Sequence, residues 1–538
     1  MNRKRKVFCF GLDGATWKVL RPLIEQGGLP VLASLINKGV AGELRSTQPP
    51  LTPAAWSSFQ TGCNPGKHGI IDFVAFDHDR HSSHFVNATS LRVPTLWQIL
   101  SSHNYRVAVV DLPVTYPPPQ VNGVVISGLM TPNRESSFVH PATLRDELET
   151  HLGYPWPLLQ EKQDEARLKR DFPSFLREMR QFIDSRISVM DFLLRREAFD
   201  VGFIQLQCID FLQHPFWNLL DPEHPHYDPI AHQLAIDGFF KPIDEAMGEL
   251  LRTVHQALGE DTLIIALSDH GFQTHEARAE LNHYLYQQGF LVPDDQPLDS
   301  WTKWVEVIRT IDVFELRKKL IKKSQKQAIN QNVSTKRIDH HRSKAWAVSS
   351  FWGYVFLGES ITKFDRQRLV EGLYRWQDPK NQRKVVKAVY RKEDIYHGSA
   401  GDNFPDMLVE PQAGYTFSSK TYFRSGSMIS PVQPGDAHMG THAMEGIFVV
   451  SGNEVKPCEP WQELSCDIMD FVPTILAWLG LPVPNHCDGQ VRNEWFTRAV
   501  NATMSDYHSP RNGAVNEVRL SGKEEQEIAG RLQQLGYL

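Results

Sequence analysis

The sequence lacks most features that mark membrane and secreted proteins. No apolar run reaches the roughly 18 residues that a membrane span needs, so we expect none. The 538 residues include only six cysteines, none of them in a CxxC pair. Scattered cysteines favour reduced thiols over a disulfide framework. The basic start "NRKRK" runs into a short apolar stretch and then a turn, unlike a secretory signal. We therefore expect a cytoplasmic protein.

A strong positive charge is also absent, because the formal net charge is -6. Without clustered basic residues, specific nucleic-acid binding is not expected. Internal repeats and low-complexity tracts are missing as well. Hydrophobic residues make up 41% of the chain and charged residues 22%, which is typical of a globular protein with a sizeable core. The composition does not indicate an oligomeric state.

Short apolar runs alternate with helical patterns along the chain. This alternation predicts an α/β fold, with a mostly parallel central sheet and helices on both faces. The expected strands lie within residues 6–14, 105–113, 123–128, 199–210, 261–271 and 445–452.

The pattern predicts one domain over residues 1–538, with three departures from the strand and helix alternation. Residues 131–200 and 294–342 predict helical insertions over the sheet, and the second contains the basic stretch "LRKKLIKKSQKQ". We interpret that stretch as a solvated helix face. Residues 344–411 carry short strand-like segments without long helices, which predicts a small antiparallel layer.

Acidic and imidazole side chains occur where expected strands end. Asp13 ends the first strand in "GLDG", and Asp269 with His270 ends another in "ALSDHGF". The carboxyl ends of parallel strands share one edge of a sheet, and ligands bind at that edge. We therefore expect these side chains to converge in space.

Four further residues complete a candidate site. Asp210 and His214 in "QCIDFLQH" are one helical turn apart and so share a helix face. Thr52 in "PLTPAAW" precedes an expected helix, and His442 in "GTHAMEGIF" precedes a strand. Three Asp, three His and one hydroxyl suit two divalent metal ions of the zinc type, which bind imidazole nitrogen and carboxylate oxygen.

These stretches, in this order, resemble the alkaline phosphatase superfamily and most closely its type I phosphodiesterase/nucleotide pyrophosphatase branch. Besides the first Asp, the matching motifs are a Thr followed nine positions later by Thr61-Gly62, then "PGKHGI", D-x-x-x-H, S-D-H-G and G-x-H. The resemblance extends from Asp13 to His442 and implies an alkaline-phosphatase-like fold.

The resemblance also implies a role for each residue of the site. One metal ion would be held by Asp13, Thr52, Asp269 and His270, and the other by Asp210, His214 and His442. Zinc is the expected metal, with manganese as the alternative. Thr52 would attack phosphorus to give a phosphothreonine intermediate, and a water activated at the other metal would hydrolyse it. Metal coordination is one of few ways to make a threonine hydroxyl nucleophilic near neutral pH.

The sequence departs from the branch at one position that binds substrate. Shortly after "HGI" the branch carries an Asn for a phosphoryl oxygen, whereas this chain has "HGIIDF", with Asp72 or Phe73 there. An unpaired carboxylate would repel a phosphate, so the nucleotide preference of the branch does not transfer. Lys67 is a candidate for a compensating positive charge, and Lys67 and Asp72 are the candidate substrate contacts.

The leading interpretation is a metal-dependent phosphodiesterase acting on a small-molecule phosphoester. A phosphomonoesterase or phosphomutase on the same fold is an alternative, but it needs a cation for the extra phosphate charge, and no recognised motif supplies an Arg. A sulfatase is disfavoured because "LTPAAW" lacks C-x-P-x-R or S-x-P-x-R. A non-catalytic metal-binding or scaffold protein is also disfavoured, because all seven site positions hold chemically competent residues.

Overall fold

The computed structural model describes most of the chain. The described residues are 4–76, 83–152, 171–294, 338–348, 351–419, 428–433, 436, 438–459, 461, 464–507 and 518–535. The predicted insertion at 294–342, with its basic stretch, falls almost entirely outside them. The same holds for residues 153–170 of the other predicted insertion.

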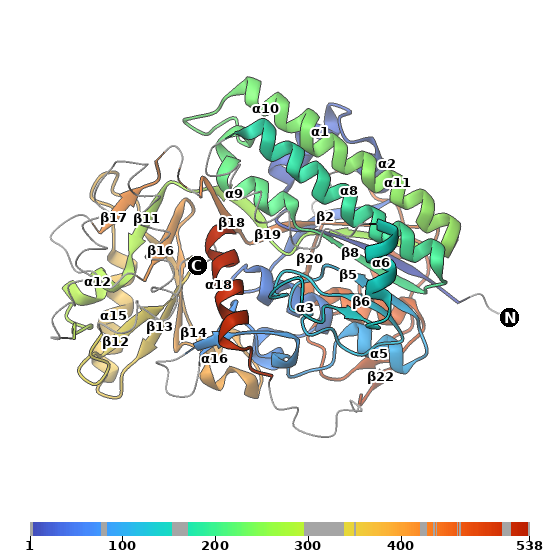
Figure 1. The fold of residues 1–538 in the computed structure, drawn as a ribbon. Helices are drawn as coiled ribbons and strands as arrows, with labels where there is room; N and C mark the ends of the chain where they lie inside the picture. The colour runs from blue at the N-terminus through green and yellow to red at the C-terminus, as the bar shows by residue number, and fades with distance from the viewer. Residues whose placement is uncertain are drawn as a thin grey trace.

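A mixed nine-stranded sheet forms the centre of the described structure (Figure 1). Its order is β20 (Ser465–Asp467), β2 (Gly39–Arg45), β19 (Glu445–Ser451), β9 (Leu263–Leu267), β1 (Val7–Leu12), β8 (Val201–Leu206), β5 (Val107–Val110), β6 (Gly123–Ile126) and β7 (Val139–His140).

The strands β9, β1, β8, β5 and β6 run parallel to their neighbours in that central part of the sheet. All six strand regions expected from the sequence contain a strand of this sheet. One of them, β19, is antiparallel to both β9 and β2, and β7 pairs antiparallel with β6. The predicted α/β architecture with a mostly parallel central sheet is confirmed.

Helices cover both faces of the sheet (Figure 1). One face carries α1 (Trp17–Glu25), α2 (Pro30–Asn37), α8 (Phe172–Arg196) and α11 (Lys241–Leu258), and the other carries α3 (Thr52–Thr61), α5 (Leu96–Ser102) and α17 (Phe471–Trp478). Successive residues of β1 point to opposite faces, so Phe8 and Phe10 join one core while Val7 and Cys9 join the other. Burial of β1 on both faces explains its continuous apolar sequence.

A small antiparallel sheet lies beside the central sheet (Figure 1). Its order is β12 (Ala345–Val348), β13 (Gly353–Leu357), β15 (Met407–Pro411) and β14 (Val386–Arg391), and every pair in it is antiparallel. Alongside it lies the sheet of β16 (Tyr415–Ser418), β11 (Ala277–Glu280) and β17 (Ile429–Pro431). The expected small antiparallel layer is therefore present.

The remaining elements connect or cover these sheets. The helices are α4 (Pro65–His68), α6 (Leu144–Leu152), α9 (Cys208–Leu220), α10 (Pro229–Ala235), α12 (Leu281–Gln287), α15 (Lys363–Arg375), α16 (Lys392–Ile395) and α18 (Gly522–Leu535). The strands are β3 (Val74–Phe76), β4 (Ser83–Phe85), β10 (Gly271–Thr274), β18 (Gly440–Ala443), β21 (Val483–Pro484) and β22 (Met504–Ser505).

The structure can be compared with the sequence for two features, disulfide bonds and membrane-spanning helices. All six cysteines are free thiols. Among the described helices, none combines the length and apolar composition needed to cross a membrane alone, although the bent pair α1 and α2 would satisfy those two criteria together.

Candidate active site

The seven predicted site residues converge at the carboxyl edge of the central sheet. Asp13 follows β1, and the pair Asp269 and His270 follows the adjacent strand β9. Helix α9, which begins just after β8, carries Asp210 and His214, one turn apart as the sequence predicts. Thr52 is the first residue of α3, and His442 lies on β18 opposite Phe272 of β10. All seven side chains are buried.

The first group consists of Asp13, Thr52, Asp269 and His270. Around His270 Nε2 lie Asp269 Oδ2 at 3.3 Å, Thr52 Oγ1 at 3.4 Å and Asp13 Oδ1 at 3.8 Å. The sequence resemblance placed these four residues around one metal ion, and their donor atoms do lie together. Thr52 thus presents its hydroxyl to a pair of carboxylates and an imidazole.

The second group consists of Asp210, His214 and His442. Asp210 Oδ1 lies 3.3 Å from His214 Nε2 and 3.3 Å from His442 Nε2. The two imidazole Nε2 atoms are 3.1 Å apart. The two groups adjoin, because the rings of His270 and His442 stack with their centroids 3.6 Å apart.

Hydrogen bonds fix which ring nitrogens face the cluster. His442 Nδ1 lies 2.9 Å from the carbonyl oxygen of Pro50, and His270 Nδ1 lies 3.1 Å from that of Gly271. A carbonyl oxygen only accepts, so each Nδ1 carries a proton, and in the neutral ring Nε2 is the nitrogen left to face a metal ion. Imidazole ligands of metal ions are commonly oriented by such a bond on the other nitrogen.

The carboxylates are oriented in a similar way. Asp13 Oδ2 accepts hydrogen bonds from Gln205 Nε2 at 2.7 Å and from Trp56 Nε1 at 3.0 Å, and Asp269 Oδ1 accepts from the backbone N–H of Gly14. Asp13 Oδ1 and Asp269 Oδ2, the two oxygens nearest His270, are buried and accept no hydrogen bond from the described residues. Buried anionic oxygens without donors are suited to cation binding, so the residues present fit a metal site.

Burial strongly perturbs the acids and bases of the cluster. It raises the pKa of Asp269 to about 7 and, together with Asp269 and Asp210, raises the pKa of Asp13 well above its usual range. Burial also tends to raise the pKa of Asp210, but His214 and His442 outweigh it and hold that pKa well below the usual range. Burial and then His442 lower the pKa of His270. Neutral imidazole is the form that binds a metal ion.

The structure gives Trp56 a testable role in orienting Asp13. We expect Trp56→Phe, which keeps a buried aromatic ring but removes the Nε1 donor, to weaken binding of the divalent ion that Asp13 would hold by about tenfold, as for other outer-shell donors. The measurement is a zinc titration against a chelating indicator. Trp97→Phe is the matched control, because Trp97 is equally buried and its Nε1 has no hydrogen-bond partner among the described residues. Wild-type affinity in Trp56→Phe would refute the role.

The two candidate substrate contacts, Lys67 and Asp72, have hydrogen-bond partners outside the seven-residue cluster. Lys67 donates to Asp488 Oδ1 at 2.5 Å and to the carbonyl oxygen of His486 at 2.9 Å, so its charge is paired. Asp72 is buried, accepts from the N–H of Phe73, and has its pKa raised to about 6 by burial. Their contact with substrate remains a prediction.

Several residues that contact the cluster carried no recognisable signal in the sequence. The ring of His438 places its Nδ1 3.2 Å from Nδ1 of His214. Phe351 stacks on His442, with an interplanar angle of 6°. Gln205 lies on β8 and Trp56 on α3, in apolar stretches that predict only core packing. Their side chains reach the cluster only through the tertiary fold.

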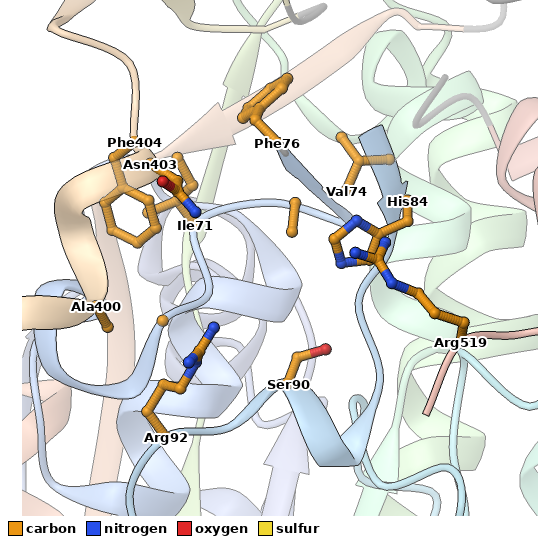
Figure 2. A pocket seen from close by; sticks show the side chains of 12 residues that line it. Ile71, Val74, Phe76, His84, Ser90, Arg92, Ala400, Asn403, Phe404 and Arg519 are labelled. Atoms are coloured by element: carbon orange, nitrogen blue, oxygen red, sulfur yellow. The ribbon is translucent and has the colours of Figure 1, made fainter. Parts of the chain in front are cut away.

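Among the described residues, one cleft and one separate cavity are relevant to substrate binding. A cleft of about 230 Å³ adjoins the cluster, because His442 lines it together with Pro50 and Leu51, which directly precede Thr52. A second cavity of about 140 Å³ is lined by none of the seven cluster residues. Figure 2 shows Arg92 and Arg519 entering that second cavity from two sides.

Comparisons with known proteins agree with the geometry. The model of the family described as type I phosphodiesterase/nucleotide pyrophosphatase matches residues 7–426. A solved structure of phosphonoacetate hydrolase from Sinorhizobium meliloti 1021 in complex with phosphonoacetate has a TM-score of 0.54 and 15% identity, covering 87% of this chain and 94% of that one. An inactive murine ectonucleotide pyrophosphatase/phosphodiesterase 5 in complex with AMP has a TM-score of 0.50 and 13% identity, covering 89% and 96%. No curated protein sequence matches.

The fold and the buried Asp, His and Thr cluster define a phosphoester hydrolase of the alkaline phosphatase superfamily. Within that class, the chain belongs to the type I phosphodiesterase/nucleotide pyrophosphatase family.

Proposed function

We propose that this chain is a two-metal phosphodiesterase with Thr52 as its nucleophile. The main support is the position of Thr52 Oγ1, buried and 3.4 Å from His270 Nε2, at the edge of three carboxylates and three imidazoles. No other hydroxyl among the seven cluster residues competes for the role. Two adjoining donor sets, Asp13 with Asp269 and His270, and Asp210 with His270 and His442, support a site for two neighbouring cations.

Asp13, Thr52, Asp269 and His270 would hold one divalent ion, and Asp210, His214 and His442 the other. Zinc is the favoured metal, with manganese as the alternative. When bound, two such ions supply four positive charges against three carboxylates and a Thr alkoxide, which lets an anionic phosphoester approach without severe repulsion and acidifies the hydroxyl.

The reaction then has two displacements at phosphorus. Thr52 Oγ1 forms a bond to phosphorus while the bond to the leaving alcohol breaks, giving a phosphothreonine diester on the protein. Water then displaces Thr52 and releases a phosphomonoester. Ring nitrogens held by the carbonyls of Pro50 and Gly271 keep the imidazoles aligned through both steps. Burial of the cluster excludes bulk water from the first displacement.

A diester is favoured over a monoester because no arginine or lysine belongs to the cluster. A monoester dianion carries one more negative charge than a diester, and that charge needs an additional cationic partner. We expect the purified protein with zinc or manganese to hydrolyse bis(4-nitrophenyl) phosphate with a kcat/KM at least about tenfold above that for 4-nitrophenyl phosphate. The absorbance of the released 4-nitrophenol product at about 405 nm measures both rates.

A preference for the monoester would contradict the proposal and favour a phosphomonoesterase or phosphomutase. Metal-dependent turnover of neither ester would favour a binding protein. The chelator-treated enzyme is the control for both assays, because spontaneous or contaminating hydrolysis does not depend on restoring the divalent ion.

A further inference from the structure

The cleft beside His442 adjoins the segment that leads into the candidate nucleophile Thr52. Its lining joins segments that lie far apart in the chain. Pro50 and Leu51 lead into Thr52, while Thr441 and His442 come from β18. The cleft therefore opens directly onto the cluster, whereas the cavity in Figure 2 is lined by none of the cluster residues.

The opposite wall of this cleft comes from the small antiparallel sheet. Phe351 and Trp352 precede β13, Lys387 lies on β14, and Glu410 lies on β15. Phe351 also stacks on the ring of His442 with centroids 5.6 Å apart. The small sheet thus brings its side chains into contact with the second group of the cluster.

The geometry of the first displacement assigns the cleft to the leaving alcohol. Thr52 belongs to the first group, and in-line attack places the leaving oxygen on the far side of phosphorus from Thr52 Oγ1. His442 belongs to the second group and lines the cleft. An alcohol that departs past His442 therefore enters the space between Phe351, Lys387 and Glu410.

The polar groups of the cleft suit a hydroxylated and uncharged group. Lys387 Nζ lies 2.9 Å from Glu410 Oε1, and Tyr390 Oη donates to Glu410 Oε2 at 2.7 Å. A paired ammonium and carboxylate offer both donors and acceptors without net charge, which matches hydroxyl groups that donate and accept. The aromatic residues Phe351 and Trp352 supply an apolar surface for the carbon skeleton.

The charge of the cleft argues against a leaving group that carries phosphate. Besides the Lys387–Glu410 pair, the described lining residues include the carboxylate of Glu445 and no arginine. Among these described residues, an additional phosphate would meet that carboxylate without an unpaired cation to balance it. The cavity in Figure 2 differs, since its described lining includes Arg92, Arg519 and His84 and none of the described lining residues is acidic.

We infer that the cleft binds a neutral polyhydroxylated leaving group, of the sugar or polyol class, through Glu410 and Lys387. This inference rests on the proposed phosphodiesterase function. It excludes nucleoside triphosphates and similar polyphosphates as preferred substrates, because their leaving group is an anion. Glu410 and Lys387 are then specificity-determining residues outside the metal cluster.

The test uses symmetrical diesters, in which the leaving group is unambiguous. The substrates are bis(4-nitrophenyl) phosphate, glycerophosphoglycerol and, as the polyphosphate, ATP, all followed by ³¹P NMR with the metal-loaded full chain. Glu410→Gln keeps the shape and an acceptor for Tyr390 but loses the charge. Lys387→Gln changes a half-exposed side chain and is the second variant, should the first fold poorly. Arg92→Gln is the matched control in the other cavity.

We expect the wild-type kcat/KM for glycerophosphoglycerol to be at least about tenfold higher than that for ATP. This is about the contribution of one charge-assisted interaction, which the anionic leaving group of ATP would lack in the cleft. Glu410→Gln and Lys387→Gln should each lower kcat/KM for glycerophosphoglycerol by about tenfold, yet change that for bis(4-nitrophenyl) phosphate by less than about threefold. Arg92→Gln should change neither diester.

Other outcomes would overturn the inference in distinguishable ways. A preference for ATP, or an equal loss on both diesters in both variants, would refute a hydroxyl-binding cleft while leaving the phosphodiesterase function intact. A selective effect of Arg92→Gln alone would assign the leaving group to the cavity in Figure 2. If wild type cleaves neither diester, the proposed function fails and the inference fails with it.

Discussion

Replacing Thr52 with alanine is expected to lower kcat for diester hydrolysis by at least about 1,000-fold, since loss of a covalent nucleophile removes the whole two-step pathway. The cluster itself should persist, because its three carboxylates and three imidazoles come from other elements of the fold. Zinc or manganese binding should therefore weaken far less than turnover. The measurements are initial rates on bis(4-nitrophenyl) phosphate and metal content after dialysis.

Two further variants in α3 distinguish loss of the nucleophile from disruption of this helix. Thr52→Ser keeps a hydroxyl and should retain measurable turnover. Ser57→Ala removes a buried hydroxyl that has no hydrogen-bond partner among the described residues, so it should leave the rate nearly unchanged. In wild type, acid quenching during turnover should trap ³²P on Thr52 when a ³²P-labelled diester is used. Near-normal rates in Thr52→Ala would rule out the nucleophile assignment.

The part of the site that sequence could predict consists of residues whose position follows from local structure. Asp13, Asp269 and His270 follow buried strands, and parallel strands bring their carboxyl ends to one edge. The spacing of Asp210 and His214 fixes a shared helix face, which α9 realises. Thr52 and His442 were candidates from their places before a helix and a strand, and the family resemblance gave each of them a role at that edge.

The residues that sequence could not identify act through contacts between distant segments. Gln205 and Trp56 meet at Asp13 only because β8 pairs with β1 in the sheet and α3 packs on a face of that sheet. His438 reaches His214 across 224 positions of chain. Likewise, β19 runs antiparallel to both of its neighbours, β9 and β2, and the apolar pattern did not reveal that direction. Such pairings are set by tertiary packing, for which a single sequence carries little local signal.

Removing the divalent ions is expected to abolish diester hydrolysis and to lower the thermal stability of the fold. Three buried carboxylates would then lie together without a balancing charge, although two of them can take up protons. Ions that bind only the folded state stabilise it by mass action, so the melting temperature should rise again when zinc or manganese is restored. Calorimetry with and without EDTA measures the difference, and turnover after readdition shows whether the loss is reversible.

The stability of the metal-free protein should also depend on pH in a defined direction. The pKa of Asp269 is raised to about 7, and burial raises the pKa of Asp13 as well, so the folded state holds protons that the unfolded chain has already lost. Stability from these groups is therefore present at low pH and is lost as the pH rises through 7. Histidines with lowered pKa, such as His270, oppose this trend only below about pH 6.5, where unfolded histidines become protonated.

The melting temperature of the metal-free protein should consequently fall between about pH 6.5 and pH 8. The melting temperature of the metal-loaded protein should stay nearly constant, because bound ions keep the carboxylates ionised throughout. Asp269→Asn tests the origin of the slope, since an amide cannot titrate and should flatten the metal-free curve. If the metal-free protein instead becomes more stable over this interval, the carboxylates of the cluster do not determine the pH dependence of its stability.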